Sequence, residues 1–176
     1  MCGYAPRYAG RMPPPPTDRL RFREMSGDDL DAMAALLGDP AVMAFYPAPK
    51  SREDADRWIH WNETNYAEHG FGLWIIETHV GEFVGDCGLT WQQVNGVRRL
   101  EVGYHVVPTH QGRGLATEAA AACRDHARGH ALSDELVAIT HPDNIASQRV
   151  AVNLGMRRIA DDFGGGTARH VFGMPL

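Results

Sequence analysis

The sequence predicts one α+β domain built around a mixed, mostly antiparallel sheet of about seven strands flanked by about four helices. The chain has 176 residues, enough for a single domain with a sizeable core. The hydrophobic period changes along the chain in the order β, α, α, three strands, α, β, α and two strands. Asn95-Gly96, between two apolar runs, indicates a hairpin of neighbouring antiparallel strands, because both positions of a type I′ turn need positive φ.

The segment before this meander begins with one strand and two helices. Leu20 and Phe22 alternate with charged residues, which is typical of a strand with one buried face. Ser51 and Asp54 form a capping box in its acidic form, and apolar residues recur at helical spacing after both Ser26 and Ser51. The strand is expected over 18–25 and the two helices over 26–38 and 51–68.

The rest of the chain alternates short apolar runs with two more helical patterns. The short apolar run over 135–140 is typical of a strand that is buried on both faces. Asn144 is a suitable N-cap for the last helix, and Gly155 a suitable stop. Strands are expected over 71–77, 80–94, 98–107, 135–140, 156–163 and 168–174, and helices over 112–128 and 145–154.

Two parts of the chain differ in composition. Residues 1–16 contain Pro13 to Pro16 and predict a polyproline II leader or a partly disordered arm, followed by one domain over 17–176. No secretory signal and no stretch of 18 apolar residues is present, so neither export nor a membrane span is expected. The odd set of cysteines (Cys2, Cys87 and Cys123) favours a reducing cytoplasm over a disulfide framework.

The charge balance and the histidine spacing exclude two classes of function. The formal net charge is −5, whereas proteins that bind nucleic acids usually carry a basic face. The nine histidines lack a convincing metal-binding spacing, so no metal is expected.

The stretch HQGRGLATEA, residues 110–119, places two glycines where a strand gives way to a helix. Free N–H groups at the start of a helix bind anions, and glycines let phosphate oxygens approach the backbone. The stretch lacks the G-x-x-x-x-G-K-[ST] pattern of a Walker loop and the G-x-G-x-x-G pattern of a dinucleotide fold. It predicts a pyrophosphate site, although an ordinary tight turn fits the same residues.

Q-x-x-G-x-A at Gln111, Gly114 and Ala116 resembles the acetyl-CoA pyrophosphate loop of the GCN5-related N-acetyltransferases, the GNAT superfamily. GDCGL at 85–89, LEVGYHVVPTHQGRGLATEA at 100–119 and HPDNIASQRVAVNLGM at 141–156 are similar to its RimJ/RimL-like branch. The resemblance extends over roughly residues 17–175. It implies the GNAT fold, with a splayed strand at the acetyl-CoA site.

The resemblance also implies which residues contact acetyl-CoA, the expected cosubstrate. The backbone of the splayed strand would bond the pantetheine arm, and the loop would hold the pyrophosphate. An Asn-x-x-Ser element would bond the arm and lie near the thioester sulfur. The residues implied are Val106, Val107, Gln111, Gly112, Arg113, Gly114, Leu115, Ala116, Thr117, Asn144 and Ser147.

Acetyl transfer to an amine needs a base and a group that assists the departing thiolate. Glu101, in LEVGY, stands where similar family members carry a glutamate and is the candidate base. Ser147 is the candidate partner of the leaving group. Glu118, one turn into the cofactor helix, is expected to make a structural hydrogen bond instead.

The expected function is acetyl transfer by direct attack in a ternary complex. The acceptor is a primary amine, either a protein N-terminus or a small molecule such as an antibiotic, a polyamine or an amino acid. The chain is expected to act as a monomer or homodimer. A non-catalytic acyl-CoA-binding module and a nucleotide phosphate binder are the alternatives. Trp58 or Trp61 would line the acceptor pocket.

Overall fold

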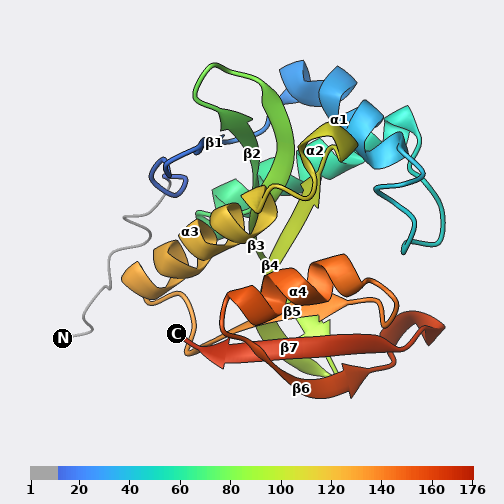
Figure 1. Cartoon of the computed structure of the whole chain (residues 1–176), viewed down its shortest axis with the longest axis vertical. Coiled ribbons are helices and arrows are strands. Elements are labelled where there is room, and N and C mark those ends of the chain that lie inside the picture. Colours follow the sequence, from blue (N-terminus) through green and yellow to red (C-terminus); the bar gives the residue numbers. More distant parts are fainter. Residues whose placement is uncertain (1–11) are drawn as a thin grey trace.

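The computed structural model describes residues 12–176 and contains one seven-stranded sheet (Figure 1). The spatial order of its strands is β1-β2-β3-β4-β5-β7-β6. β4 and β5 are parallel, and every other neighbouring pair is antiparallel. The strands are β1 (Leu20–Arg23), β2 (Leu73–Thr78), β3 (Phe83–Val94), β4 (Val97–Val106), β5 (Glu135–Thr140), β6 (Arg157–Asp162) and β7 (Arg169–Pro175). The α+β fold predicted from the sequence is confirmed.

Four α-helices flank this sheet. They are α1 (Leu30–Gly38), α2 (Arg52–His69), α3 (Leu115–Gly129) and α4 (Ile145–Asn153). The predicted capping box is present at α2, where the Ser51 hydroxyl accepts from the Asp54 N–H and the Asp54 carboxylate accepts from the Ser51 N–H. Asn95 and Gly96 have φ of +48° and +78°, as the predicted hairpin turn requires.

The two helix pairs contact opposite faces of the sheet. Cys87 on β3 lies 3.7 Å, sulfur to sulfur, from Cys123 on α3. The adjacent Asp86 points to the other face and accepts a hydrogen bond from the Trp58 indole of α2. Tyr104, opposite Cys87 on β4, contacts Ser147 of α4. The α3 and α4 helices therefore cover one face, and α2, which packs against α1, covers the other.

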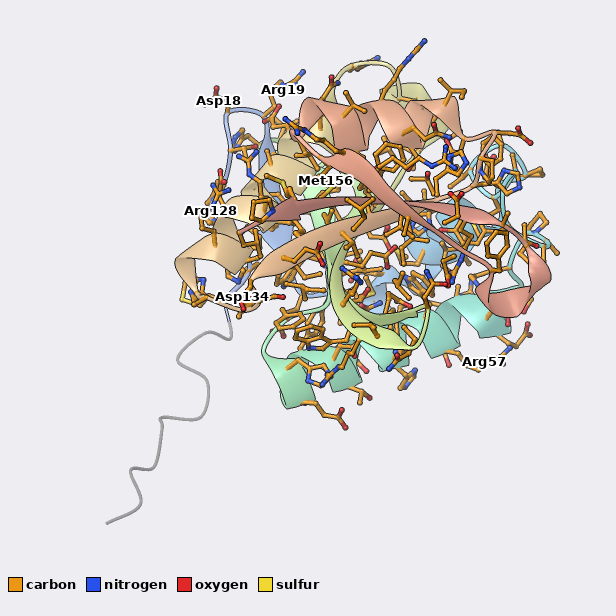
Figure 2. The ribbon with its side chains drawn as sticks, turned by 90° about the horizontal axis from the view of Figure 1, so that it is seen from below. Asp18, Arg19, Arg57, Arg128, Asp134 and Met156 are labelled. Atoms are coloured by element: carbon orange, nitrogen blue, oxygen red, sulfur yellow. The ribbon has the colours of Figure 1, made fainter. Side chains whose placement is uncertain are left out.

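A single large cluster of buried side chains joins the helices to the sheet. Trp74 and Leu89 of the central strands are among its fully buried members. Met156, labelled in Figure 2, is also buried and belongs to this core. The flexible thioether of methionine suits an irregular space of this kind.

The sheet opens between its two parallel strands. Only Leu100–Leu136 and Glu101–Val137 are paired across β4 and β5. Beyond these two pairs, β4 continues to Val106 and β5 continues to Thr140, but the two strands no longer pair with each other. This separation is the splay expected from the sequence, and it leaves backbone groups of both strands free to bind a ligand.

The start of the helix α3 was predicted wrongly. A helix was expected from residue 112, but α3 begins at Leu115. The φ angles of Gly112 and Gly114 are +72° and +77°, which lie outside the right-handed helix. The two glycines therefore belong to the turn that precedes the helix.

The described part of the proline segment packs against the domain. Pro14 is buried, whereas Pro15 and Pro16 are exposed. Residues 1–11, with Cys2 and most of the predicted leader, lie outside the described residues. Within 12–176 no helix has the length and apolar character needed to cross a membrane.

Candidate active site

The turn between β4 and α3 presents a row of backbone donors. Across residues 12–176, the backbone N–H groups of residues 112–117 have no hydrogen-bond acceptor, and the first amide bond of the helix runs from Glu118 to the Gly114 carbonyl. The space where a Cβ of Gly112 would lie is open. We name these six N–H groups the amide cradle. With the dipole of the 15-residue helix behind it, the cradle can bind a pyrophosphate.

Arg19, which the sequence analysis missed, fixes the cradle from outside. Its Nη1 donates to the Arg113 carbonyl at 2.9 Å, and its Nε lies 2.6 Å from the Glu118 carboxylate. The Thr17 hydroxyl also donates to Glu118 at 2.6 Å. Burial opposes ionisation of Glu118, but these bonds lower its pKa overall. Glu118 thus makes structural bonds, as expected, and no local motif pointed to Arg19.

The end of β4 supplies one free donor instead of the two expected. The Val107 N–H donates to the Val84 carbonyl at 2.9 Å, and its own carbonyl accepts from the His110 N–H. The Val107 N–H is therefore occupied by the protein, whereas its carbonyl keeps a second lone pair, and its expected contact with pantetheine stays a prediction. Because ladder bonds alternate along a strand, the Val106 N–H points toward the gap beside β5.

Gln111 lies in the predicted loop and braces it. Its side-chain amide donates to the Val106 carbonyl at 2.8 Å, which ties the loop to the end of β4. This side chain therefore acts on the loop's shape, while its expected contact with the cosubstrate stays a prediction.

Glu101 lies where the sheet begins to open. The Thr90 hydroxyl donates to its carboxylate at 3.3 Å, and the Ile139 N–H of β5 donates to it as well. Burial raises the pKa of Glu101 to about 7, although these two bonds and the charges of Arg169 and His105 oppose the rise. A carboxylate with this pKa suits a general base at neutral pH.

Ser147 lies on the other face, at the start of α4. The Tyr104 hydroxyl donates to the Ser147 carbonyl at 2.9 Å and lies 3.0 Å from its Oγ. The Asn144 side chain accepts from the Ser147 N–H at 3.0 Å and so caps the helix. Glu101 and Tyr104 point to opposite faces of β4, so the two expected catalytic groups approach the gap from opposite sides.

A second group of polar side chains lies on the face that α2 covers. His105 Nδ1 is 2.8 Å from the Asp86 carboxylate, and His105 Nε2 is 2.8 Å from the Tyr46 hydroxyl. The Trp58 indole donates to Asp86 at 3.1 Å, and the His105 N–H donates to it at 3.1 Å. We name Asp86, His105 and Tyr46 the relay. The Trp58 indole thus bonds a buried carboxylate, and its expected place in the acceptor pocket stays a prediction.

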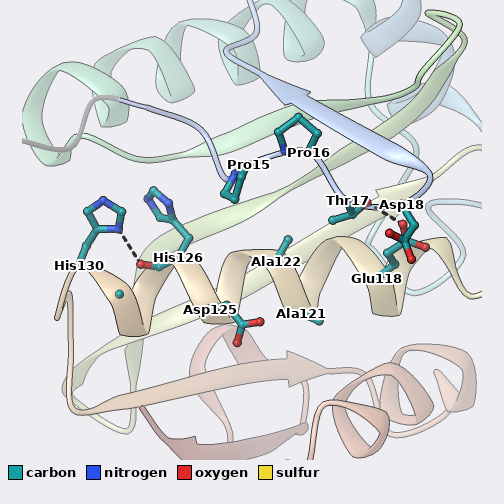
Figure 3. Close-up of a pocket in the computed structure, with 11 residues that line it drawn as sticks. Pro15, Pro16, Thr17, Asp18, Glu118, Ala121, Ala122, Asp125, His126 and His130 are labelled. Atoms are coloured by element: carbon teal, nitrogen blue, oxygen red, sulfur yellow. Dashed lines mark hydrogen bonds between the residues drawn. The ribbon is translucent and has the colours of Figure 1, made fainter.

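A separate groove of about 620 Å³ lies along α3 (Figure 3). Pro15, Pro16 and Thr17 form one side of it, and Glu118 and His126 lie on the other. Burial and the charge of His130 lower the pKa of His126 to about 4, so its imidazole is neutral at pH 7. The groove holds none of the expected site residues. Within residues 12–176 no group of three or more His, Cys, Asp or Glu is arranged to hold a metal ion.

The fold, the open parallel pair and the amide cradle define an acetyltransferase of the GNAT class. Residues 19–157 match the acetyltransferase (GNAT) domain family, and the chain belongs to this family. The superfamily and the N-acetyltransferase class predicted from the sequence are confirmed.

Particular relatives agree with this assignment. YkkB of Bacillus subtilis is 39% identical over 142 residues, which cover 80% of this chain and 83% of YkkB. An acetyltransferase from Agrobacterium tumefaciens has the same fold, with a TM-score of 0.80, 24% identity and coverage of 98% of this chain and 99% of that one. RimL, the ribosomal L7/L12 α-N-protein acetyltransferase, solved in complex with coenzyme A, gives a TM-score of 0.74 at 16% identity, covering 93% of this chain and 97% of RimL.

Proposed function

We propose that this protein transfers the acetyl group of acetyl-CoA to a primary amine by direct attack in a ternary complex. The observation that carries the proposal is the amide cradle beside the gap between β4 and β5. It offers unpaired donors for a pyrophosphate next to unpaired strand edges for an extended arm. RimL, a structural neighbour, is described in complex with coenzyme A, which agrees with this use of the fold.

The residues present fit the cosubstrate. The cradle spans Gly112 to Thr117, and the exposed Arg113 adds a positive charge at its edge. The Val106 N–H is the donor on β4 for the pantetheine arm, and Ser147 of α4 and the N-cap Asn144 lie on the face of β4 to which Tyr104 points. When bound, acetyl-CoA supplies the thioester that the amine attacks.

Glu101 holds the incoming ammonium and takes one of its protons. With a pKa of about 7, the carboxylate is largely ionised at the upper end of the neutral range and can accept a proton from an amine held beside it. Another N–H on the edge of β4 that faces the gap can then donate to the oxyanion that forms, because this edge has no partner in β5 beyond Glu101.

Ser147 assists the departing sulfur. Its hydroxyl forms a pair with that of Tyr104, so a proton given to the sulfur by Ser147 can be replaced through Tyr104. Cys87 and Cys123 take no part, since they are buried between β3 and α3.

A thiol-release assay with acetyl-CoA tests the proposal. The amines are short peptides with varied N-termini, amino acids, spermidine and kanamycin. Release of coenzyme A that depends on one of these amines, with the acetylated product seen by mass spectrometry, is the expected result. Binding of coenzyme A with no transfer to any of them would favour the alternative, a non-catalytic acyl-CoA-binding module.

The same panel assigns the acceptor class. A peptide N-terminus would agree with RimL, which is named for acetylation of a protein α-amine. A small amine would place the enzyme in metabolism or resistance. A cytoplasmic location and a monomeric or homodimeric state stay predictions.

A further inference from the structure

We propose that Tyr46 is a second catalytic residue, which takes a proton from the attacking amine and passes it to His105, and that Asp86 positions His105 for this step. The inference rests on the acetyl transfer proposed above and assigns the face of the sheet from which the acceptor approaches.

The relay connects a buried carboxylate to a hydroxyl near the surface. Asp86 is 0% exposed, His105 is 8% exposed and Tyr46 is 44% exposed. The His105 Nδ1–H donates to Asp86, which leaves Nε2 of the neutral imidazole to accept the Tyr46 O–H. A lone pair of the Tyr46 oxygen is then free for an N–H of the substrate.

Surrounding contacts fix Asp86 and His105 and leave Tyr46 open. Asp86 accepts three bonds, from the Trp58 indole and from the ring and the backbone N–H of His105. The Trp58 ring meets the His105 ring edge-on, with centroids 5.8 Å apart. Among the described residues, the Tyr46 hydroxyl bonds only to His105. A chain held tightly at its buried end and open at its outer end can carry a proton inward.

The relay lies on the same face of β4 as the candidate base, Glu101. His105 and Glu101 point to the same face of β4, because both are odd-numbered positions of one strand. The Tyr46 hydroxyl lies 2.8 Å from His105 Nε2 on this face, and burial and the negative charges of Glu101 and Asp86 raise its pKa. An amine held by Glu101 would therefore enter on the face of the sheet where Tyr46 and His105 lie.

The charges around His105 keep it suited to accept a proton. Burial lowers the pKa of His105, but the charge and hydrogen bond of Asp86 and the charge of Glu101 raise it above its usual value overall. Lys50, whose ammonium lies 5.4 Å from the centre of the Trp58 ring, opposes the rise. Asp86 thus stabilises the imidazolium, in the way a carboxylate stabilises the base of a hydrolytic triad.

The protons balance in this scheme. The ammonium gives its first proton to Glu101, and the amine nitrogen forms a bond to the thioester carbon. When the C–S bond breaks, its electron pair goes to sulfur. The second nitrogen proton goes to the Tyr46 oxygen while the Tyr46 proton goes to His105 Nε2. Ser147 gives its proton to the sulfur and regains one from solvent, while Glu101 and His105 release theirs to solvent, so one proton is released overall.

The test is the pH dependence of kcat at saturating acetyl-CoA and saturating amine, using the amine of the panel that is turned over fastest. Glu101 must be ionised and His105 neutral, so log kcat should rise with a slope approaching two on the acid side. Tyr46→Phe keeps the ring and cuts the relay. We expect it to lower kcat roughly 100-fold and to reduce this slope by one, with the Kd of coenzyme A unchanged.

Two further variants complete the design. Asp86→Asn should lower kcat and shift the acid limb to lower pH, because it removes the charge that raises the pKa of His105. His60→Gln is the control, since His60 forms an exposed pair with Asp56 on the same α2 helix. It should match the wild type.

The outcomes separate the two proposals. A wild-type enzyme that transfers acetyl groups, with a Tyr46→Phe variant of unchanged slope, would overturn the relay and leave the proposed function in place. A purely structural role of Tyr46 would give that result, with or without a lower kcat. A protein that binds coenzyme A but acetylates no amine of the panel would overturn both.

Discussion

The amide cradle and the relay differ in how the chain builds them. The cradle is made of backbone groups from six consecutive residues, 112–117, and its chemistry follows from two glycines before a helix. The relay is made of side chains from three segments: Asp86 on β3, His105 on β4 and Tyr46 in the connection between α1 and α2. A contiguous backbone site can be recognised in the sequence, whereas a network of distant side chains depends on the register of the sheet.

Because the cradle consists of backbone donors for an anion, a single negative charge placed in it should abolish tight binding of coenzyme A. Gly114→Asp places a carboxylate where the pyrophosphate binds, and two like charges about 4 Å apart near a protein surface cost about 4 kcal/mol. We expect the Kd of coenzyme A, measured by calorimetry, to rise roughly 1,000-fold.

Gly114→Asn is the matched control for this variant. Asn and Asp both tolerate the positive φ of this position, so the two variants share shape and backbone strain. The Asn variant should lose only a few-fold in affinity. Equal losses in two folded variants would contradict an anion at this site.

Substitutions of the catalytic side chains should lower turnover and leave the affinity for coenzyme A nearly unchanged. Glu101→Gln removes the proposed base, so kcat should fall about 100-fold while the Kd of coenzyme A stays within two-fold. In the wild type, kcat should rise as the pH passes through about 7, since the carboxylate must be ionised to accept a proton. Wild-type turnover by Glu101→Gln across the pH range would remove it as the base.

A smaller effect is expected across the gap, at the leaving group. Ser147→Ala removes one hydrogen bond to the departing sulfur, which is worth about tenfold in kcat. Thermal stability should be unchanged, because the Asn144 cap accepts from the Ser147 backbone N–H, which alanine retains. A large drop in the melting temperature would instead point to a structural role for the hydroxyl pair with Tyr104.

The smallest effect concerns stability. The pKa of Glu101 is raised in the folded protein, so the folded state binds its proton more tightly and stability is lost as the pH rises from about 4.5 through about 7. Glu101→Gln removes this loss. Denaturant unfolding should show a gain of about 1 kcal/mol at pH 8, after allowance for screening by solvent, and no gain at pH 5.

The sequence predicted the elements and the cradle because their signals are local. The strand over 135–140 and the Ser51 cap lie where they were expected. The start of α3 was missed, because the helical pattern of apolar residues says nothing of where positive φ begins. The free N–H of Val106 and the occupied N–H of Val107 depend on the ladder with β3, which only the paired strands reveal.

The relay and Arg19 could not be predicted for a different reason. Tyr46 and His105 are 59 positions apart, and Arg19 and Arg113 are 94 positions apart. Each is an ordinary residue in its own segment, and its role arises from a contact made in the folded sheet. Glu101 was identified by resemblance, but its raised pKa comes from burial at the opening of the sheet.

The two paired positions between β4 and β5 also determine how the molecule responds mechanically. They join the antiparallel block β1–β4 to the block β5–β7 through Leu100–Leu136 and Glu101–Val137 alone in the sheet. A pantetheine arm bound in the gap would act as a removable strand that links the blocks. Amide hydrogen exchange at 102–106 and 138–140 should therefore slow when coenzyme A binds. The free energy of unfolding should increase by RT ln(1 + [L]/Kd), where [L] is the concentration of free coenzyme A. Each turnover would then stiffen and release the centre of the sheet.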